Sequence, residues 1–126
     1  MEISAAPPLC FSPDNRHLAG TSWKEGLVKV WDASTGHEVV SWKAHQGTAN
    51  GVCYSRNSKV LVTAGGDQMV RLWDPETQLM LAELPHNAEA YGVIFSPDGK
   101  TLATTGYDHL VKLWDVSEIP EIAETP

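Results

Sequence analysis

Two sets of side chains in this sequence have the composition of a hydrolase triad. Each set combines a histidine, a threonine and an aspartate at the same spacing: His45, Thr63 and Asp67, then His86, Thr104 and Asp108. A histidine between a hydroxyl and a carboxylate can activate that hydroxyl as a nucleophile. Such catalysis also needs an exposed nucleophile and an oxyanion hole, and the sequence supplies neither. Because the same set occurs twice, we interpret it as structural and predict no catalytic residue.

A tryptophan follows each threonine by ten residues, at Trp73 and Trp114. A buried indole N–H needs an acceptor, which a threonine hydroxyl can provide while it donates a hydrogen bond to a neutral histidine. The second ring N–H of that histidine can then donate to the aspartate. We therefore predict two buried tetrads whose completed hydrogen bonds rigidify the fold.

The remaining chemistry-bearing residues do not form a metal or cofactor site. The five histidines are scattered, without a pair at i, i+2 or i, i+4. Cys10 and Cys53 belong to no Cys-x-x-Cys pair and occupy equivalent positions, where a third copy has Ile94, so we interpret them as small buried hydrophobic residues. Gly65-Gly66-Asp67 is a turn with no helix behind it, which argues against a phosphate loop. We predict no metal and no cofactor.

The elements that position these residues recur along the chain. The dipeptide Trp-Asp occurs at Trp31-Asp32, Trp73-Asp74 and Trp114-Asp115, at intervals of 42 and 41 residues. Each tryptophan ends a run of alternating apolar and basic residues, such as Leu110-Val111-Lys112-Leu113. Self-similarity at about 40 to 45 residues indicates an array of propeller blades.

Each repeat is predicted to contain short strands joined by tight turns. In the third repeat the strands are residues 92–95, 101–105 and 110–114, and Ser96-Pro97-Asp98-Gly99 forms a type I turn with Gly99 at positive φ. Fourth strands follow at residues 37–42 and 79–84 in the first two repeats. The third repeat lacks a convincing fourth strand, because two prolines interrupt the residues after Asp115.

With these motifs the chain resembles the WD-repeat (WD40) family of β-propellers over roughly residues 9–115. The resemblance implies an all-β fold of three consecutive four-stranded antiparallel repeats in an open or partial propeller. It also implies the tetrads, since His45 precedes Asp67 by 22 residues and Trp73 follows by six. The first repeat departs from the pattern: Glu25 replaces the aspartate and no histidine lies upstream, although Thr21 and Trp31 match.

The repeats suggest a division of the chain. We expect a lead-in at residues 1–8, then repeats at 9–45, 46–86 and 87–117, the last with an incomplete fourth strand. Residues 118–126 form an acidic C-terminal tail. Three blades are too few to close a propeller, which has four to eight. The chain is therefore expected to be a fragment of a longer propeller or, as the alternative, a homo-oligomer, and another segment could add itself to the edge of the third blade.

The family resemblance also suggests where a partner binds. In WD-repeat proteins the loops with the histidine and aspartate lie on the usual partner-binding face, which here predicts contacts by Trp23, Lys24, Asn50, Tyr91 and Tyr107. Exposed aromatic residues commonly anchor interfaces, so Trp23, Tyr91 and Tyr107 are the favoured anchors. The alternative is that each ring packs against the neighbouring blade.

The sequence is compatible with three functions. The favoured one is a non-catalytic WD40-repeat module or scaffold for protein–protein interaction. The alternative is a regulatory propeller segment of a larger protein with a catalytic domain elsewhere. A ligand or enzyme site in the propeller channel is disfavoured, since the first strands carry apolar residues such as Leu9, Val52 and Val93 where such a site needs charged ones.

Charge and hydropathy narrow the choice of partner. The net charge of −7 and the pI near 5.0 argue against nucleic acid and against anionic membranes. No apolar run approaches the roughly 18 residues that span a bilayer, and the first residues lack the basic region of a signal peptide. We therefore expect a cytoplasmic protein with a protein or peptide partner on the loop face.

Overall fold

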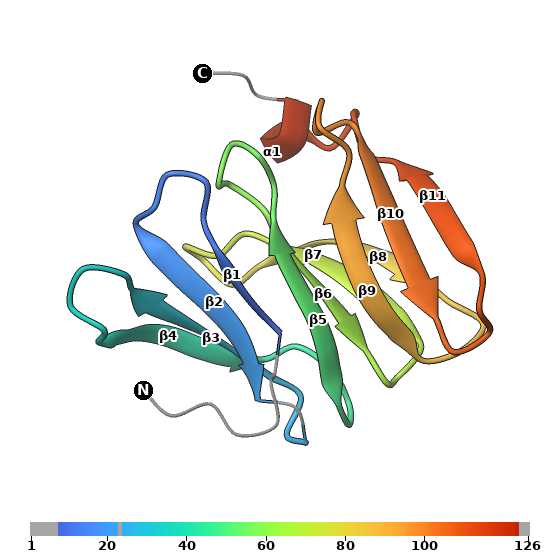
Figure 1. The fold of residues 1–126 in the computed structure, drawn as a ribbon, viewed down its shortest axis with the longest axis horizontal. Coiled ribbons are helices and arrows are strands. Elements are labelled where there is room, and N and C mark those ends of the chain that lie inside the picture. Colours follow the sequence, from blue (N-terminus) through green and yellow to red (C-terminus); the bar gives the residue numbers. More distant parts are fainter. Residues whose placement is uncertain (1–7, 23, 124–126) are drawn as a thin grey trace.

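The computed structural model describes residues 8–22 and 24–123. Three antiparallel sheets stand side by side in chain order, the first in blue and the third in orange (Figure 1). The expected all-β fold of open propeller blades is confirmed, since the only helix in the described part of the chain is the single turn α1 (Pro120–Ala123). None of the described helical residues form a helix long and apolar enough to cross a membrane.

The first two sheets each contain four strands in the order of the chain. The first sheet holds β1 (Leu9–Phe11), β2 (His17–Ser22), β3 (Leu27–Asp32) and β4 (Glu38–Lys43). The second sheet holds β5 (Ala49–Tyr54), β6 (Leu61–Gly65), β7 (Met69–Trp73) and β8 (Met80–Pro85). Each sheet is therefore one complete blade.

The third sheet has three strands: β9 (Ala90–Phe95), β10 (Thr101–Gly106) and β11 (Val111–Asp115). Its missing fourth strand was expected from the prolines after Asp115. The turn between β9 and β10 forms as the sequence indicates, because Gly99 N donates to Ser96 O at 2.8 Å and Gly99 has a φ of 76°. We refer to the three sheets as blade one, blade two and blade three.

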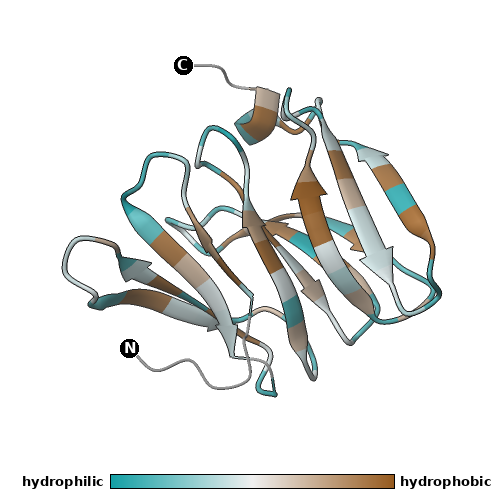
Figure 2. Ribbon diagram, viewed as in Figure 1, coloured by the Kyte–Doolittle hydropathy of each residue, from teal (hydrophilic) through white to brown (hydrophobic). Residues whose placement is uncertain are grey.

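The blades pack face to face, and their strands alternate hydrophobic and polar residues (Figure 2). The Trp of each blade lies opposite a leucine of the second strand, in the pairs Leu18–Trp31, Leu61–Trp73 and Leu102–Trp114. Between blades one and two the buried core includes Val28 and Val30 on one side and Tyr54, Leu61 and Trp73 on the other. Trp42 packs on this core, with its ring centre 5.8 Å from that of Trp73.

A second core lies between blades two and three. It buries Val62, Val70 and Leu72 of blade two against Leu102 of blade three. The innermost strands β5 and β9 approach each other closely, since a Cβ built on Gly51 would lie 2.1 Å from the carbonyl oxygen of Tyr91. Glycine at this position therefore lets two blades meet backbone to backbone.

The residues after β11 include the start of the acidic tail predicted from the sequence, for which no helix was expected. They form α1, and Ile119 and Ile122 pack against the core between blades two and three. Asn57 Nδ2 donates to Glu121 O at 2.8 Å, which attaches the helix to a turn of blade two. The two isoleucines, three residues apart, provide the apolar contact that overrides the polar composition of the segment.

Blade one departs from the pattern at its second strand. Gly20, two residues after Leu18, occupies the place that Thr63 has two residues after Leu61. The expected match of Thr21 to Thr63 is therefore wrong: Thr21 pairs with Val28, and its buried hydroxyl has no hydrogen-bond partner. The extra residue before Trp31 shifts Thr21 onto the opposite face of the strand, because side chains alternate along a strand.

Neither cysteine is in a disulfide. Burial raises the pKa of the Cys10 thiol to about 11, and burial also raises the pKa of Cys53. Both thiols stay protonated near neutral pH and pack against the cores as apolar groups, although the residues are partly buried and not fully buried as expected.

Candidate functional site

The turns that hold Asp67 and Asp108 lie at one end of the sheets, and so do the described candidate contact residues Lys24, Asn50, Tyr91 and Tyr107, whereas Trp73 and Trp114 lie near the far ends of their strands. In Figure 1 the turns from β2 to β3, from β6 to β7 and from β10 to β11 lie at the lower end, together with the connections between blades. Gly26, Gln68 and His109 have equivalent places in these turns, each with a φ between 64° and 68°. The repeats therefore build one loop face, as the resemblance implies.

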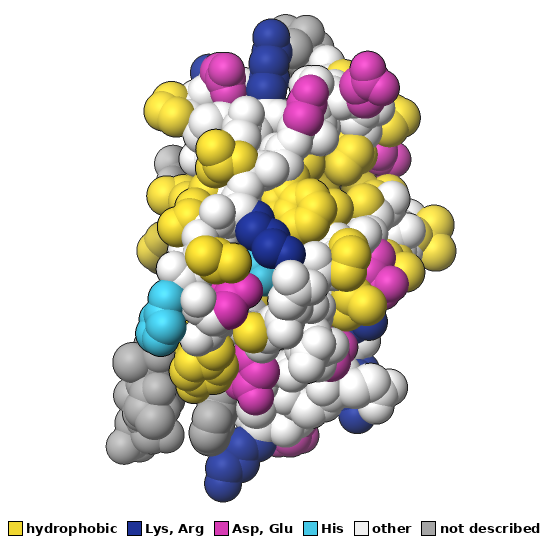
Figure 3. All heavy atoms as spheres, turned by 90° about the vertical axis from the view of Figure 1, so that its right-hand side faces the viewer, with side chains coloured by type: hydrophobic (Ala, Val, Ile, Leu, Met, Phe, Trp, Pro, Cys, Tyr) yellow, Lys and Arg dark blue, Asp and Glu magenta, His cyan; other side chains and the backbone are white. Residues whose placement is uncertain are grey.

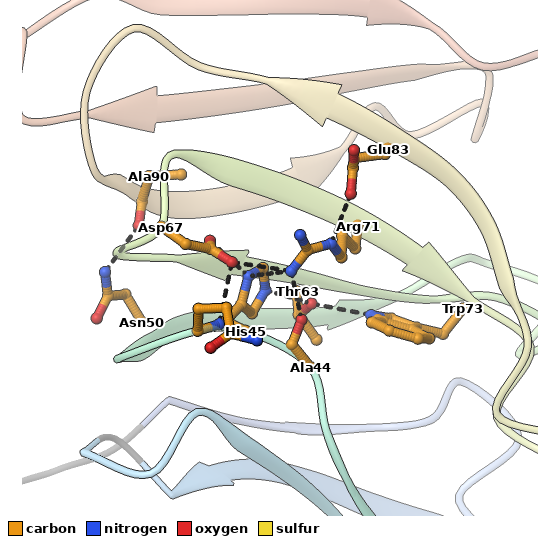
Figure 4. Close-up of polar contacts among 10 residues, drawn as sticks. Ala44, His45, Asn50, Thr63, Asp67, Arg71, Trp73, Glu83 and Ala90 are labelled. Carbon is orange, nitrogen blue, oxygen red and sulfur yellow. Dashed lines mark hydrogen bonds and ion pairs between the residues drawn. The ribbon is translucent and has the colours of Figure 1, made fainter.

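The structure brings all four residues of the first tetrad together (Figure 4). Trp73 Nε1 donates to Thr63 Oγ1 at 3.0 Å, and the same hydroxyl lies 2.7 Å from His45 Nε2. His45 Nδ1 lies 2.9 Å from Asp67 Oδ1. The chain of contacts assigns one tautomer: Nδ1 carries the proton and donates to the carboxylate, while Nε2 accepts from the threonine.

Asp67 receives further donors on its other oxygen. Gln46 N and Arg71 Nη1 donate to Asp67 Oδ2 at 3.1 and 2.9 Å. Arg71 also donates to Ala44 O at 2.7 Å and to Glu83 at 2.9 Å. Burial raises the pKa of Asp67, but the interactions with His45, Gln46 and Arg71 outweigh it and leave the pKa below its usual value.

The histidine at the centre of this network is neutral. His45 is 1% exposed, and burial lowers the pKa of its imidazole against the attraction of the Asp67 carboxylate. A neutral ring is needed here, since its Nε2 must accept a hydrogen bond from the Thr63 hydroxyl. The hydrogen bonds and the pKa direction therefore agree on the same protonation state.

The second tetrad is only partly formed. Trp114 Nε1 donates to Thr104 Oγ1 at 2.9 Å, and His86 Nε2 lies 2.6 Å from that hydroxyl. The expected hydrogen bond from His86 to Asp108 is absent: His86 Nδ1 and Asp108 Oδ2 are both buried without a partner. Asp108 Oδ1 instead accepts from Leu110 N at 3.2 Å and so caps its own turn.

One substitution distinguishes the two blades beside the tetrad. Lys112 occupies in blade three the place that Arg71 has in blade two, because each lies opposite the threonine of its tetrad. A guanidinium can bridge two carboxylates and a carbonyl, whereas an ammonium is a point charge. Lys112 Nζ lies 5.9 Å from the ring centre of Trp114. Nothing equivalent to the Arg71 contact draws Asp108 towards His86.

The two tetrads do not provide the exposed nucleophile of a hydrolase triad. Thr63 and Thr104 have no exposed surface, so neither hydroxyl can reach a substrate. Among residues 8–22 and 24–123, no group of three His, Cys, Asp or Glu side chains could hold a metal ion.

The candidate contact residues separate into two kinds. Tyr91 and Tyr107 form an edge-to-face pair with ring centres 4.3 Å apart, and they are 38% and 54% exposed. Lys24 is exposed as well. Asn50 instead joins blades two and three, since its Nδ2 donates to Ala90 O at 2.9 Å. Trp23 lies outside the described residues.

Arg71 is the functional residue that the sequence analysis missed. It lies four residues after Asp67, within the alternating run that ends at Trp73. The sequence did contain one indication of this role, since Arg71 follows Asp67 by four residues and carries the opposite charge. The role of Arg71 also depends on Ala44 O, in the connection after β4, and on Glu83 in β8.

Comparison with known proteins identifies the family. The family model described as "WD domain, G-beta repeat" matches residues 9–32, 36–74 and 80–115. These stretches cover well over half of the chain, and the chain belongs to the WD-repeat family.

Sequences of known proteins match part of this chain. Pre-mRNA-processing factor 19 of Oryza sativa subsp. japonica is 39% identical over 64 residues, which are 51% of this chain and 12% of that protein. WD repeat-containing protein 1 of Mus musculus is 31% identical over 78 residues, 60% of this chain and 13% of that protein. Nuclear distribution protein PAC1 of Arthroderma benhamiae is 29% identical over 75 residues, 56% of this chain and 16% of that protein. The match therefore spans a small part of each relative.

Proposed function

We propose that this chain is a non-catalytic interaction module whose loop face binds a protein or peptide partner. The exposed pair Tyr91–Tyr107 carries the proposal, because two aromatic rings in contact present a large apolar surface at low entropic cost. Lys24 and Asn50 lie on the same loop face, and Trp23 is a further proposed anchor. Domains of this family generally bind protein partners.

The role that we propose for the tetrads is structural. The first tetrad ties the β6–β7 turn to the connection before β5 through hydrogen bonds, and the hydroxyls of both tetrads are buried. The net charge of −7 favours a partner with a basic or neutral contact surface over nucleic acid or an anionic membrane. The cytoplasmic location expected from the sequence stays a prediction.

A second candidate follows from the relatives. The match covers 12% to 16% of their lengths, so we also propose that a module of this kind can be one regulatory segment of a longer protein. In that arrangement the blades would position a partner for a domain elsewhere. The loop-face site is common to both candidates.

A capture experiment tests the proposed function. The immobilised chain and two variants, Tyr107→Ala and Lys100→Ala, are incubated with the same cell extract, and bound proteins are quantified by mass spectrometry. Lys100 is exposed in the β9–β10 turn, at the opposite end of the strands. We expect at least one protein that the parent and Lys100→Ala retain and Tyr107→Ala loses. Equal retention by all three chains would contradict the proposal.

A further inference from the structure

Asn50 and the glycine that follows it lie at the junction of blades two and three. Asn50 Nδ2 donates to Ala90 O at 2.9 Å, so its amide joins β5 to the first residue of β9 (Figure 4). The backbone of Gly51 approaches β9 so closely that an added Cβ would lie 2.1 Å from Tyr91 O. Two consecutive residues therefore provide a polar contact and a backbone contact between the blades.

This junction attaches blade three to blade two. Its inner strand β9 contacts β5 and β6, and the core between the blades buries Leu102 of β10. The side of blade three that faces away from blade two is turned to solvent and shows hydrophobic side chains (Figure 3). A chemical change at Asn50 would therefore act directly on the contact that holds blade three.

An asparagine that precedes a glycine is chemically labile in water. The main-chain nitrogen of the glycine attacks the side-chain carbonyl carbon of the asparagine and forms a cyclic succinimide, while the amide group leaves as ammonia with the proton of that nitrogen. Water then opens the ring to aspartate or isoaspartate. Glycine favours ring closure, because no Cβ hinders its backbone. Asn50 is the only asparagine of the chain that precedes a glycine.

The strand is irregular at this residue. The register of β5 on β6 passes from the pair Ala49–Gly65 to the pair Gly51–Ala64. Asn50 is the extra residue between these pairs, and a bulged residue lies outside the ladder with a backbone that departs from regular strand geometry. Ring closure needs such a departure, because an extended backbone holds the side-chain carbonyl away from the next main-chain nitrogen. The bulge therefore weakens the protection that a strand gives to this pair.

The other asparagines provide an internal comparison. Asn57 Oδ1 accepts from Ser55 Oγ at 2.7 Å and from Lys59 N at 3.0 Å, which fixes its side chain within its own turn. Asn15 precedes an arginine, and Asn87 precedes an alanine, so the following residue has a side chain in both cases. None of these three asparagines combines a following glycine with a place at a bulge.

We propose that Asn50 is a site of deamidation, and that its conversion loosens the junction of blades two and three. An ionised carboxyl group at this position has no proton to donate to Ala90 O, so two acceptor oxygens face each other at hydrogen-bond distance. Isoaspartate also lengthens the main chain by one carbon beside Gly51, where the backbone already meets Tyr91 O. Both products oppose closure of the junction. The proposal is independent of the proposed function, because the reaction needs no partner.

Incubation of the whole folded chain at mildly alkaline pH tests the modification, since base favours the attacking form of the glycine nitrogen. Peptide mapping by mass spectrometry follows the conversion of each asparagine over time. We expect Asn50 to convert several-fold faster than Asn57 and Asn87. Asn50→Gln keeps an amide but requires a larger ring, so it should abolish conversion at this position. A folded parent chain in which Asn50 converts no faster than Asn57 or Asn87 would overturn the proposal.

A second experiment tests the consequence for the junction. Asn50→Asp should melt several degrees below the parent, and its amides at residues 88–92 should exchange faster. Asn50→Ala removes the amide without adding a charge and should melt between the two. Asn87→Asp is the matched control, because it makes the same charge change at an exposed residue before β9 and should melt like the parent.

The order of these melting temperatures decides the second part of the proposal. If Asn50→Asp melts like Asn87→Asp, the junction does not depend on the Asn50 amide, and the proposed consequence is wrong. If Asn50→Ala melts at or below Asn50→Asp, the carboxylate does not oppose Ala90 O, and the proposed cause of the loosening is wrong.

Discussion

Arg71 Nη1 donates to Asp67 Oδ2 at 2.9 Å, and this contact distinguishes blade two from blade three. In blade two the guanidinium holds the carboxylate beside His45. In blade three Lys112 makes no equivalent contact, and Asp108 Oδ2 stays buried without a partner. The two tetrads therefore differ in how much they should contribute to stability.

The first prediction compares the two aspartates. Asp67→Ala should lower the free energy of unfolding by about 1–3 kcal/mol, because it leaves the His45 N–H and the Gln46 N–H without their acceptor. Asp108→Ala should cost about 1 kcal/mol or less, since only the bond from Leu110 N is lost. Urea denaturation of both variants measures the difference. Equal losses would mean that Asp108 engages His86 in solution.

The second prediction concerns the basic residue of each tetrad. Lys112→Arg should raise the free energy of unfolding by about 1 kcal/mol, because a guanidinium can reach the unpartnered Asp108 oxygen. Arg71→Lys should lower it by a similar amount through loss of the bridge between Asp67 and Glu83. Urea denaturation again provides the measurement. A gain from Lys112→Arg that persists in Asp108→Ala would show that the arginine acts elsewhere.

The third prediction concerns pH. Burial lowers the pKa of His45 and of His86 below the usual 6.5. The unfolded chain then binds protons more readily than the folded chain, so this contribution to stability is present above about pH 6.5 and is lost as the pH falls through the lower folded pKa values. The free energy of unfolding should therefore decrease between pH 7.5 and pH 5.

A histidine variant checks the origin of that pH dependence. The free energy of unfolding of the His45→Gln variant should decrease less steeply with falling pH than that of the parent. His37→Gln changes an exposed histidine and should keep the parent's slope. A parent chain whose stability is constant from pH 7.5 to pH 5 would show that the buried histidines titrate equally in both states.

The fourth prediction tests the contact between blades two and three. Gly51→Ala should destabilise the chain by about 1–3 kcal/mol, since the added Cβ would lie 2.1 Å from Tyr91 O and the backbone must shift. Ser117→Ala, which removes only a local hydrogen bond from the Ser117 hydroxyl to Asp115 Oδ1, serves as the reference for a mild substitution. Thermal unfolding by circular dichroism measures both. A Gly51→Ala chain that melts like the parent would place the two blades further apart.

Much of the fold could be predicted because the pattern repeats. The runs that end at Trp31, Trp73 and Trp114 indicate the third strand of each blade, and the turn at Ser96–Gly99 indicates where β9 ends. The residues after Asp115 could not be predicted in the same way. Ile119 and Ile122 form a helix because they find an apolar contact between two blades, and that contact depends on the folded chain.

The site was predictable only where spacing in the sequence reflects spacing in the structure. The contacts from His45 to Thr63 and from Trp73 to Thr63 follow from the repeated intervals. The role of Arg71 does not, because its partner Ala44 lies in the connection after β4 and its partner Glu83 lies in β8. Thr21 illustrates the opposite error: its spacing from Trp31 is right, but one extra residue turns it to the other face of the strand.

The central claim, that the loop face binds the partner, is tested most directly by hydrogen exchange with a captured partner. Amide exchange of the chain is measured by mass spectrometry with and without that partner. We predict slower exchange in the complex at residues 86–92 and 106–110, the segments around Tyr91 and Tyr107. Protection confined to residues 97–100, in the turn at the opposite end of blade three, would contradict the account.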